Sequence, residues 1–179
     1  MYTHQLMSIR LATLKGSGLF DSFVTAFSLG NPGVHTEIWI DGYRVSTFAE
    51  GATCVSVIPM GDICPSDWYV MEIPVRDLHT AISYVEQAVR SPATYRYYLP
   101  ELAMPKALLD RVDTDLDCQR PATWDRLFCS QFALLFLRRC AMSGVLDVDE
   151  RRLKLLWSIN SRGCLPSRLK IIAERVFVR

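Results

Sequence analysis

A cysteine and a histidine in this sequence have neighbours that suit nucleophilic catalysis. Cys129 stands near the start of a run of apolar, helix-forming residues, and His35 begins a run of strand-forming residues. A thiolate is the reactive form of cysteine, and a histidine beside it can take up the thiol proton. Because the two residues lie far apart in the sequence, only the fold can bring them together.

The segment that begins at His35 predicts a β-hairpin. Residues 35–40 and 43–48 are rich in strand formers, and the dipeptide between them, Asp41-Gly42, is a strong signal for a two-residue turn. Such a turn fixes the register between the two strands, so that the residues sharing each face can be assigned. In this register Glu37 lies opposite Ser46.

One face of the predicted hairpin is polar. It carries His35, Glu37, Trp39, Arg44, Ser46 and Phe48. Glu37 follows His35 by two residues on this face, and Ser46 lies diagonally across from the histidine. Either side chain can orient an imidazole, as the third member of a catalytic triad does, and the sequence leaves the choice open.

Cys129 belongs to an amphipathic segment that predicts a helix over residues 124–142. The N-terminus of a helix lowers the pKa of a nearby thiol, and its free N–H groups can bind a developing oxyanion. Both effects require Cys129 to lie in the first turn. The alternative is a buried structural thiol, which is common for free cysteines, just as a histidine at a strand start is commonly a surface residue.

Composition favours one globular domain with its own core. The chain has 179 residues, of which 50% are hydrophobic and 22% are charged. A net charge of +1 gives no electrostatic reason to expect a nucleic-acid partner. No apolar run approaches the roughly 20 residues of a transmembrane segment. The six cysteines form no CxxC pair, so we expect free thiols, no metal or cofactor, and an intracellular protein.

The hydrophobic patterns predict an α+β fold in which a small antiparallel sheet packs against helices. Within the sheet, two further strands are expected over 52–58 and 68–75. The domain is expected to cover 1–179, with a helical or irregular segment over 1–30, the sheet over 33–75, and helices over 77–91, 124–142 and 166–177.

Taken together and in order, these segments resemble the circularly permuted branch of the papain-like, NlpC-type superfamily. In that branch the histidine strand comes first and the cysteine helix comes last. The matching stretches are Val34-His35-Thr36-Glu37-Ile38 and Phe128-Cys129-Ser130-Gln131. Softer matches are Glu50-Gly51-Ala52 and the segment Gly163–Leu169. The resemblance covers roughly residues 33–172 and implies a permuted papain-like fold.

The resemblance implies a cysteine peptidase or amidase in which a thiol attacks an amide or ester. Cys129 would be the nucleophile and His35 the base, while Glu37 or Ser46 would fix the histidine tautomer. The implied partners are peptide or amide substrates, peptidoglycan and lipids among them. Large DNA viruses and phages also carry such proteins.

Two more residues are candidates for contact with the substrate. Trp39 lies on the polar face of the hairpin, and Gln131 follows Cys129 by two residues. Gln131 replaces the glutamate that is usual after Cys-Ser in the superfamily. It keeps the capacity for hydrogen bonds but lacks the charge.

Two other functions stay open on the sequence. A lipid acyltransferase or thioesterase of the same fold predicts an apolar groove beside Cys129, but the acyltransferase relatives carry a second histidine where this chain has Ser46. A catalytically inactive binding protein or virion component, with a viral or other protein partner, predicts a blocked cleft and an unreactive thiol.

Overall fold

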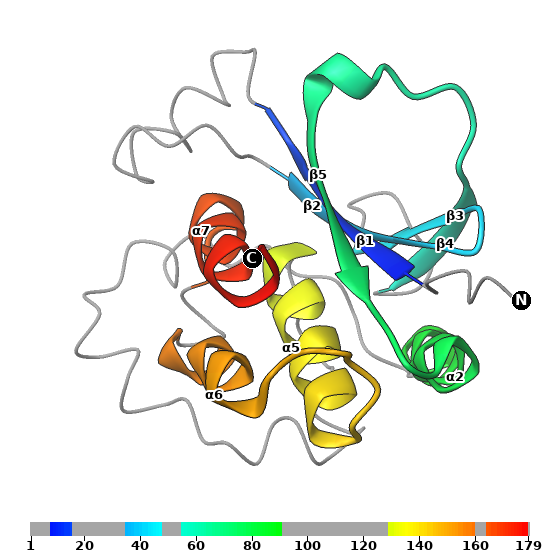
Figure 1. Ribbon diagram of the computed structural model, residues 1–179. Coiled ribbons are helices and arrows are strands. Elements are labelled where there is room, and N and C mark those ends of the chain that lie inside the picture. Colours follow the sequence, from blue (N-terminus) through cyan, green and yellow to red (C-terminus); the bar gives the residue numbers. More distant parts are fainter. Residues whose placement is uncertain (1–7, 16–34, 48–54, 91–128, 160–163, 179) are drawn as a thin grey trace, which may run out of the picture.

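The structure, a computed structural model, describes residues 8–15, 35–47, 55–90, 129–159 and 164–178. Within these residues a five-stranded sheet packs against helices, which confirms the predicted α+β class (Figure 1). The strands are β1 (Ser8–Leu14), β2 (His35–Ile40), β3 (Tyr43–Ser46), β4 (Ser56–Pro59) and β5 (Trp68–Pro74). The helices are α2 (Leu78–Arg90), α5 (Cys129–Met142), α6 (Glu150–Leu153) and α7 (Pro166–Phe177), with 3-10 turns at Pro65–Asp67 and Lys154–Ser158.

The sheet is antiparallel throughout, in the order β4-β3-β2-β1-β5. The β2–β3 hairpin has the predicted register, with Trp39 paired to Arg44. At its turn both Asp41, with φ of 49°, and Gly42, with φ of 76°, are left-handed. A two-residue turn of this type requires positive φ at both positions, which explains why the Asp-Gly signal was reliable.

The prediction of a helical or irregular N-terminal segment is wrong for Ser8–Leu14. These residues form β1, which pairs with β2 on one side and with β5 on the other. Ile9 and Leu11 face the core and alternate with Arg10, which is exposed. Leucine and alanine favour helices, so local propensity hid this strand. Hydrogen bonding to strands on both sides decides its conformation instead.

Other boundaries differ less. The strand expected over 52–58 is found as β4, which begins at Ser56. The helix expected over 166–177 is α7, and a proline occupies its first turn as predicted. The expected start of the cysteine helix at residue 124 and the segment Glu50-Gly51-Ala52 lie outside the described residues. Helix α6 and the 3-10 turn after it were not predicted.

Helix α5 lies at the centre of the helical layer. It contacts β2, α2, α7 and the turn at Lys154–Ser158, and Figure 1 shows it between the sheet and α6. Phe132 and Phe136 are fully buried, and the residues from 129 to 138 are buried on every side of the helix. A helix that is buried all round is held by packing in every direction, so its N-terminus has a fixed place beside β2. In the part of the chain that the structure describes, no helix has the length and apolar character needed to cross a membrane.

Candidate active site

The structure brings Cys129 and His35 together. Cys129 is the first residue of α5, His35 is the first residue of β2, and these two elements pack against each other. Each side chain shifts the pKa of the other through its charge and through hydrogen bonding. The contact that the sequence could only suggest is therefore present in the fold.

The main chain around Cys129 also favours a negative sulfur. Hydrogen bonding by the N–H groups of Thr36 and Ser130 contributes to lowering the pKa of the thiol. The residues before Cys129 lie outside the described part of the chain, so its place in the first turn of the helix stays a prediction.

Glu37 is the residue that holds the imidazole. Its carboxylate is fully buried, and its Oε1 atom lies 3.2 Å from Nε2 of His35. Arg44 donates from Nη2 to Oε1 at 2.6 Å and from Nε to Oε2 at 2.7 Å, while Trp39 donates from Nε1 to Oε2 at 2.8 Å. Each carboxylate oxygen therefore has two nitrogen atoms within 3.2 Å.

These contacts set the protonation states of the three residues. Burial alone would lower the pKa of His35, but the charges and hydrogen bonds of Cys129 and Glu37 outweigh it and raise that pKa to about 10. Burial would raise the pKa of Cys129, yet the charge and hydrogen bond of His35, with two backbone N–H groups, lower it. Burial would raise the pKa of Glu37, but hydrogen bonds from His35, Arg44 and Trp39 lower it to about 2. The site therefore favours a thiolate–imidazolium pair beside a carboxylate.

Ser46, the other candidate for the third residue, has a different contact. Its buried hydroxyl donates to the main-chain oxygen of Thr36 at 2.7 Å. Ser46 thus ties β3 to β2 beside the site. Of the two candidates that the sequence left open, Glu37 is the one that the structure places at the imidazole.

Trp39 and Gln131 are both buried. Trp39 donates to Glu37 and its ring lies 5.4 Å from that of Trp68, so it supports the carboxylate from within the sheet. Gln131 lies in the first turn of α5. A direct contact of either residue with a substrate stays a prediction.

The sequence reasoning missed two residues of the site, Arg44 and Trp68. Arg44 was placed on the correct face but was given no role, although its diagonal position relative to Glu37 was a usable signal. The ring centroids of Trp68 and His35 lie 6.4 Å apart in a T-shaped arrangement. The guanidinium carbon of Arg44 lies 5.5 Å from the centroid of the Trp68 ring. It reaches His35 across Leu14 of β1, so it could not be placed while that strand was unrecognised.

The other described cysteines differ from Cys129. Burial raises the pKa of the Cys140 thiol to about 12, opposite to the direction at Cys129. Cys164 is buried near the start of α7, where its carbonyl accepts a hydrogen bond from the Ser130 hydroxyl. Cys64 is exposed. Comparing the labelling rates of Cys64 and Cys129 can therefore distinguish the effect of solvent exposure from the effect of a lowered thiol pKa.

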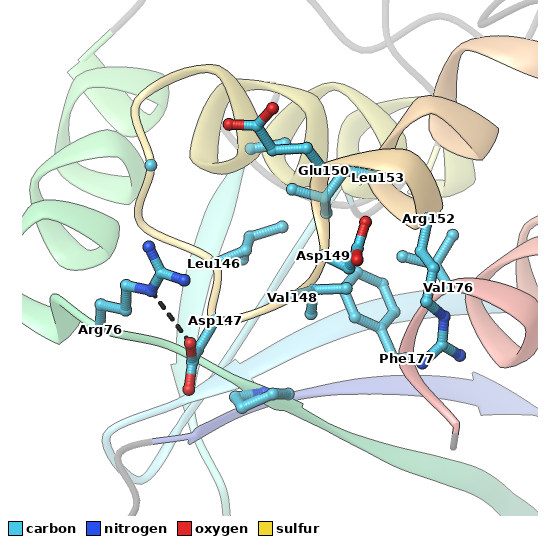
Figure 2. A pocket seen from close by; sticks show the side chains of 13 residues that line it. Arg76, Leu146, Asp147, Val148, Asp149, Glu150, Arg152, Leu153, Val176 and Phe177 are labelled. Atoms are coloured by element: carbon cyan, nitrogen blue, oxygen red, sulfur yellow. Dashed lines mark hydrogen bonds and ion pairs between the residues drawn. The ribbon is translucent and has the colours of Figure 1, made fainter.

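A cavity of about 490 Å³ lies at the other end of α5 (Figure 2). Its lining includes Ala141 and Gly144, and α5 spans 14 residues, so the cavity is about 20 Å from Cys129 along the helix. Two arginines that line it are held by other groups of the protein. Arg76 and Asp147 form an ion pair at 3.0 Å, as Figure 2 shows, and Arg152 donates to the carbonyl of Arg175 at 2.9 Å. This cavity is separate from the thiol site.

Comparison with models of known protein families, with curated proteins and with solved structures finds no match to this chain.

Proposed function

We propose that this protein is a thiol hydrolase, a cysteine peptidase or amidase, with Cys129 as nucleophile and His35 as base. One observation carries the proposal: Cys129, His35 and Glu37 form a continuous row from α5 to the centre of the sheet. Together they supply a nucleophile, a base and a group that orients the base, which are the parts that covalent catalysis requires.

Acylation begins with the sulfur. The Cys129 thiolate attacks the carbonyl carbon of an amide, a C–S bond forms, and the carbonyl π electrons move to oxygen. We assign the Cys129 N–H to the stabilisation of that oxyanion. The imidazolium of His35 then gives its proton to the leaving nitrogen, the C–N bond breaks, and a thioester and a free amine result.

Deacylation uses the same residues in reverse. Neutral His35 takes a proton from water, and the resulting hydroxide attacks the thioester carbon. The C–S bond breaks, the acid leaves, and the sulfur departs as a thiolate beside a protonated His35. Glu37 keeps the ring in one orientation through both halves of the reaction and stabilises its protonated form.

The arrangement of elements supports a permuted papain-like fold as part of this proposal. The histidine strand precedes the cysteine helix in the chain, α5 packs against that strand, and the sheet is antiparallel. Fold alone does not define a function, so the proposal depends on the contacts of the three side chains.

The proposal is tested by trapping the acyl-enzyme. The protein is incubated with a panel of activated peptide, amino-acid and fatty-acyl esters, quenched in acid and mapped by mass spectrometry. We expect a hydroxylamine-sensitive acyl group on Cys129 and substrate turnover that Cys129→Ala abolishes while Cys64→Ala leaves it intact.

The panel also separates the alternatives. An adduct formed with fatty-acyl esters and not with peptide esters would replace the peptidase proposal with a lipid acyltransferase or thioesterase. A folded protein that forms no adduct from any ester, or turnover that is unchanged in Cys129→Ala, would contradict catalysis by Cys129 and favour a binding or structural role.

A further inference from the structure

Arg44 completes a row of four charges in and beside the buried site. Cys129 meets His35, His35 meets Glu37, and Glu37 meets Arg44. As thiolate, imidazolium, carboxylate and guanidinium, the four groups alternate in sign and sum to zero. This balance matters because the Cys129 and Glu37 side chains have almost no contact with solvent, and an uncompensated buried charge is strongly unfavourable.

The geometry of Arg44 fixes the carboxylate in place. Its guanidinium binds both oxygens of Glu37, at 2.6 and 2.7 Å, and lies 5.5 Å from the centre of the Trp68 ring. A two-pronged contact of this kind fixes the plane of the carboxylate as well as its position. With that plane fixed, Oε1 stays 3.2 Å from Nε2 of His35.

We propose that Arg44 is a positioning residue that holds Glu37 ionised and directed at His35, and whose positive charge allows Cys129 to remain a thiolate. The proposal rests on the proposed function, because it takes Cys129 as the nucleophile. Arg44 acts through Glu37 and His35, so it is distinct from the residues that contact the substrate.

Removing the charge of Arg44 leaves two anions and one cation in the row. The net negative charge favours uptake of one proton. Between the two anions, a thiolate is more basic than a carboxylate, with ordinary pKa values of 9.0 and 4.5. We expect the proton to go to Cys129, so that loss of Arg44 acts at the nucleophile although Glu37 and His35 lie between them.

The chain offers a matched control on the same face of the sheet. Arg10 of β1 and Arg44 of β3 are both cross-strand neighbours of Trp39. Arg10 pairs with Glu72 of β5 at 3.4 Å, and these two side chains are 50% and 66% exposed. Arg10→Met thus removes an arginine that has the same strand neighbour but lies outside the buried row.

The test is the pH dependence of Cys129 alkylation by iodoacetamide, followed by peptide mapping in the wild type, Arg44→Met and Arg10→Met. We expect Arg44→Met to lower the rate at acid and neutral pH by about tenfold, as one unit in the thiol pKa would do, and to shift the profile to higher pH. Arg10→Met should leave the profile unchanged. An Arg44→Met profile that superimposes on the wild type would overturn the proposal.

A double variant tests the balance of charge directly. Glu37→Gln with Arg44→Met removes one negative and one positive charge, so the row is neutral again and much of the lost rate should return. If the double variant is alkylated at Cys129 no faster than Arg44→Met alone, charge balance is contradicted. If Arg44→Met does not fold, Arg44→Lys takes its place. Lysine keeps the charge but loses one hydrogen bond, so we expect a smaller shift of the pH profile of Cys129 alkylation. Arg44→Lys identical to the wild type would then overturn the positioning role.

The outcomes separate the two proposals. If Cys129 of the wild type is not preferentially alkylated, the proposed function fails whatever Arg44 does. If Cys129 is activated in the wild type and equally activated in Arg44→Met, only the role of Arg44 fails.

Discussion

The Nε2 atom of His35 lies 3.2 Å from Oε1 of Glu37, and the two residues occupy alternate positions on one strand, β2. The spacing of two residues puts both side chains on the same face of the sheet, so the orientation of the base is built into a single element. The thiol comes from a second element, α5, and only the packing of that helix on β2 brings it into contact.

Glu37→Gln is expected to destabilise the protein at neutral pH. It leaves the Arg44 guanidinium without its counter-charge, and breaking a buried ion pair in this way costs about 3 kcal/mol. The pKa of Glu37 is lowered from 4.5 to about 2 in the folded protein, so its contribution to stability is present above about pH 4.5 and is lost as the pH falls towards 2.

Urea unfolding at several pH values measures this difference. The free energies of unfolding of the wild type and Glu37→Gln should converge as the pH falls from 4.5 to 2. Glu72→Gln, in which the exposed pair with Arg10 is broken, is the control and should change stability little at any pH. If the free energies of unfolding of Glu37→Gln and the wild type differ by the same amount across this pH range, the assigned role of the Glu37 carboxylate is contradicted.

Ser46→Ala is expected to weaken the sheet without deactivating the thiol. The hydroxyl binds the carbonyl of Thr36, so its loss should lower the free energy of unfolding by about 1 kcal/mol. The pH profile of Cys129 alkylation should stay that of the wild type, whereas Glu37→Gln should change it. If Ser46→Ala shifts the pH profile of Cys129 alkylation as far as Glu37→Gln does, Ser46 and not Glu37 alone orients His35.

Gly42→Ala tests the turn that sets the register of the hairpin. Gly42 has a φ of 76°, and an added Cβ would meet no atom within 4 Å, so the penalty is conformational and not steric. We expect a loss of about 1 kcal/mol in the free energy of unfolding. Asp41→Asn, at the neighbouring left-handed position, should be nearly neutral because asparagine tolerates this conformation. Equal losses from both substitutions would contradict the turn geometry.

Local signals in the sequence were sufficient for the elements that local chemistry determines. The Asp41-Gly42 turn gave the hairpin register and hence the shared face of His35 and Glu37, and Pro166 marked the start of α7. These features depend on a few adjacent residues. They need no knowledge of what packs against them.

Features that depend on distant partners were harder to predict. Strand β1 has helix-forming residues and is extended only because β2 and β5 lie on either side of it. Trp68 reaches His35 across that strand, so it was missed with it. The choice of Glu37 over Ser46 needed the direction of each side chain, which residue spacing alone does not provide.

The measurement that tests the central claim most directly is the rate of Cys129 alkylation as a function of pH, compared between the wild type and His35→Gln with Cys64 as the internal standard. Cys64 is exposed and Cys129 is only 2% exposed, so access alone predicts faster labelling of Cys64. An ion pair with His35 predicts that Cys129 reacts faster than Cys64 at acid pH, with a midpoint below the ordinary thiol pKa of 9.0 that rises in His35→Gln. A Cys129 that reacts more slowly than Cys64 at every pH, or a midpoint that is unchanged in His35→Gln, would contradict the account.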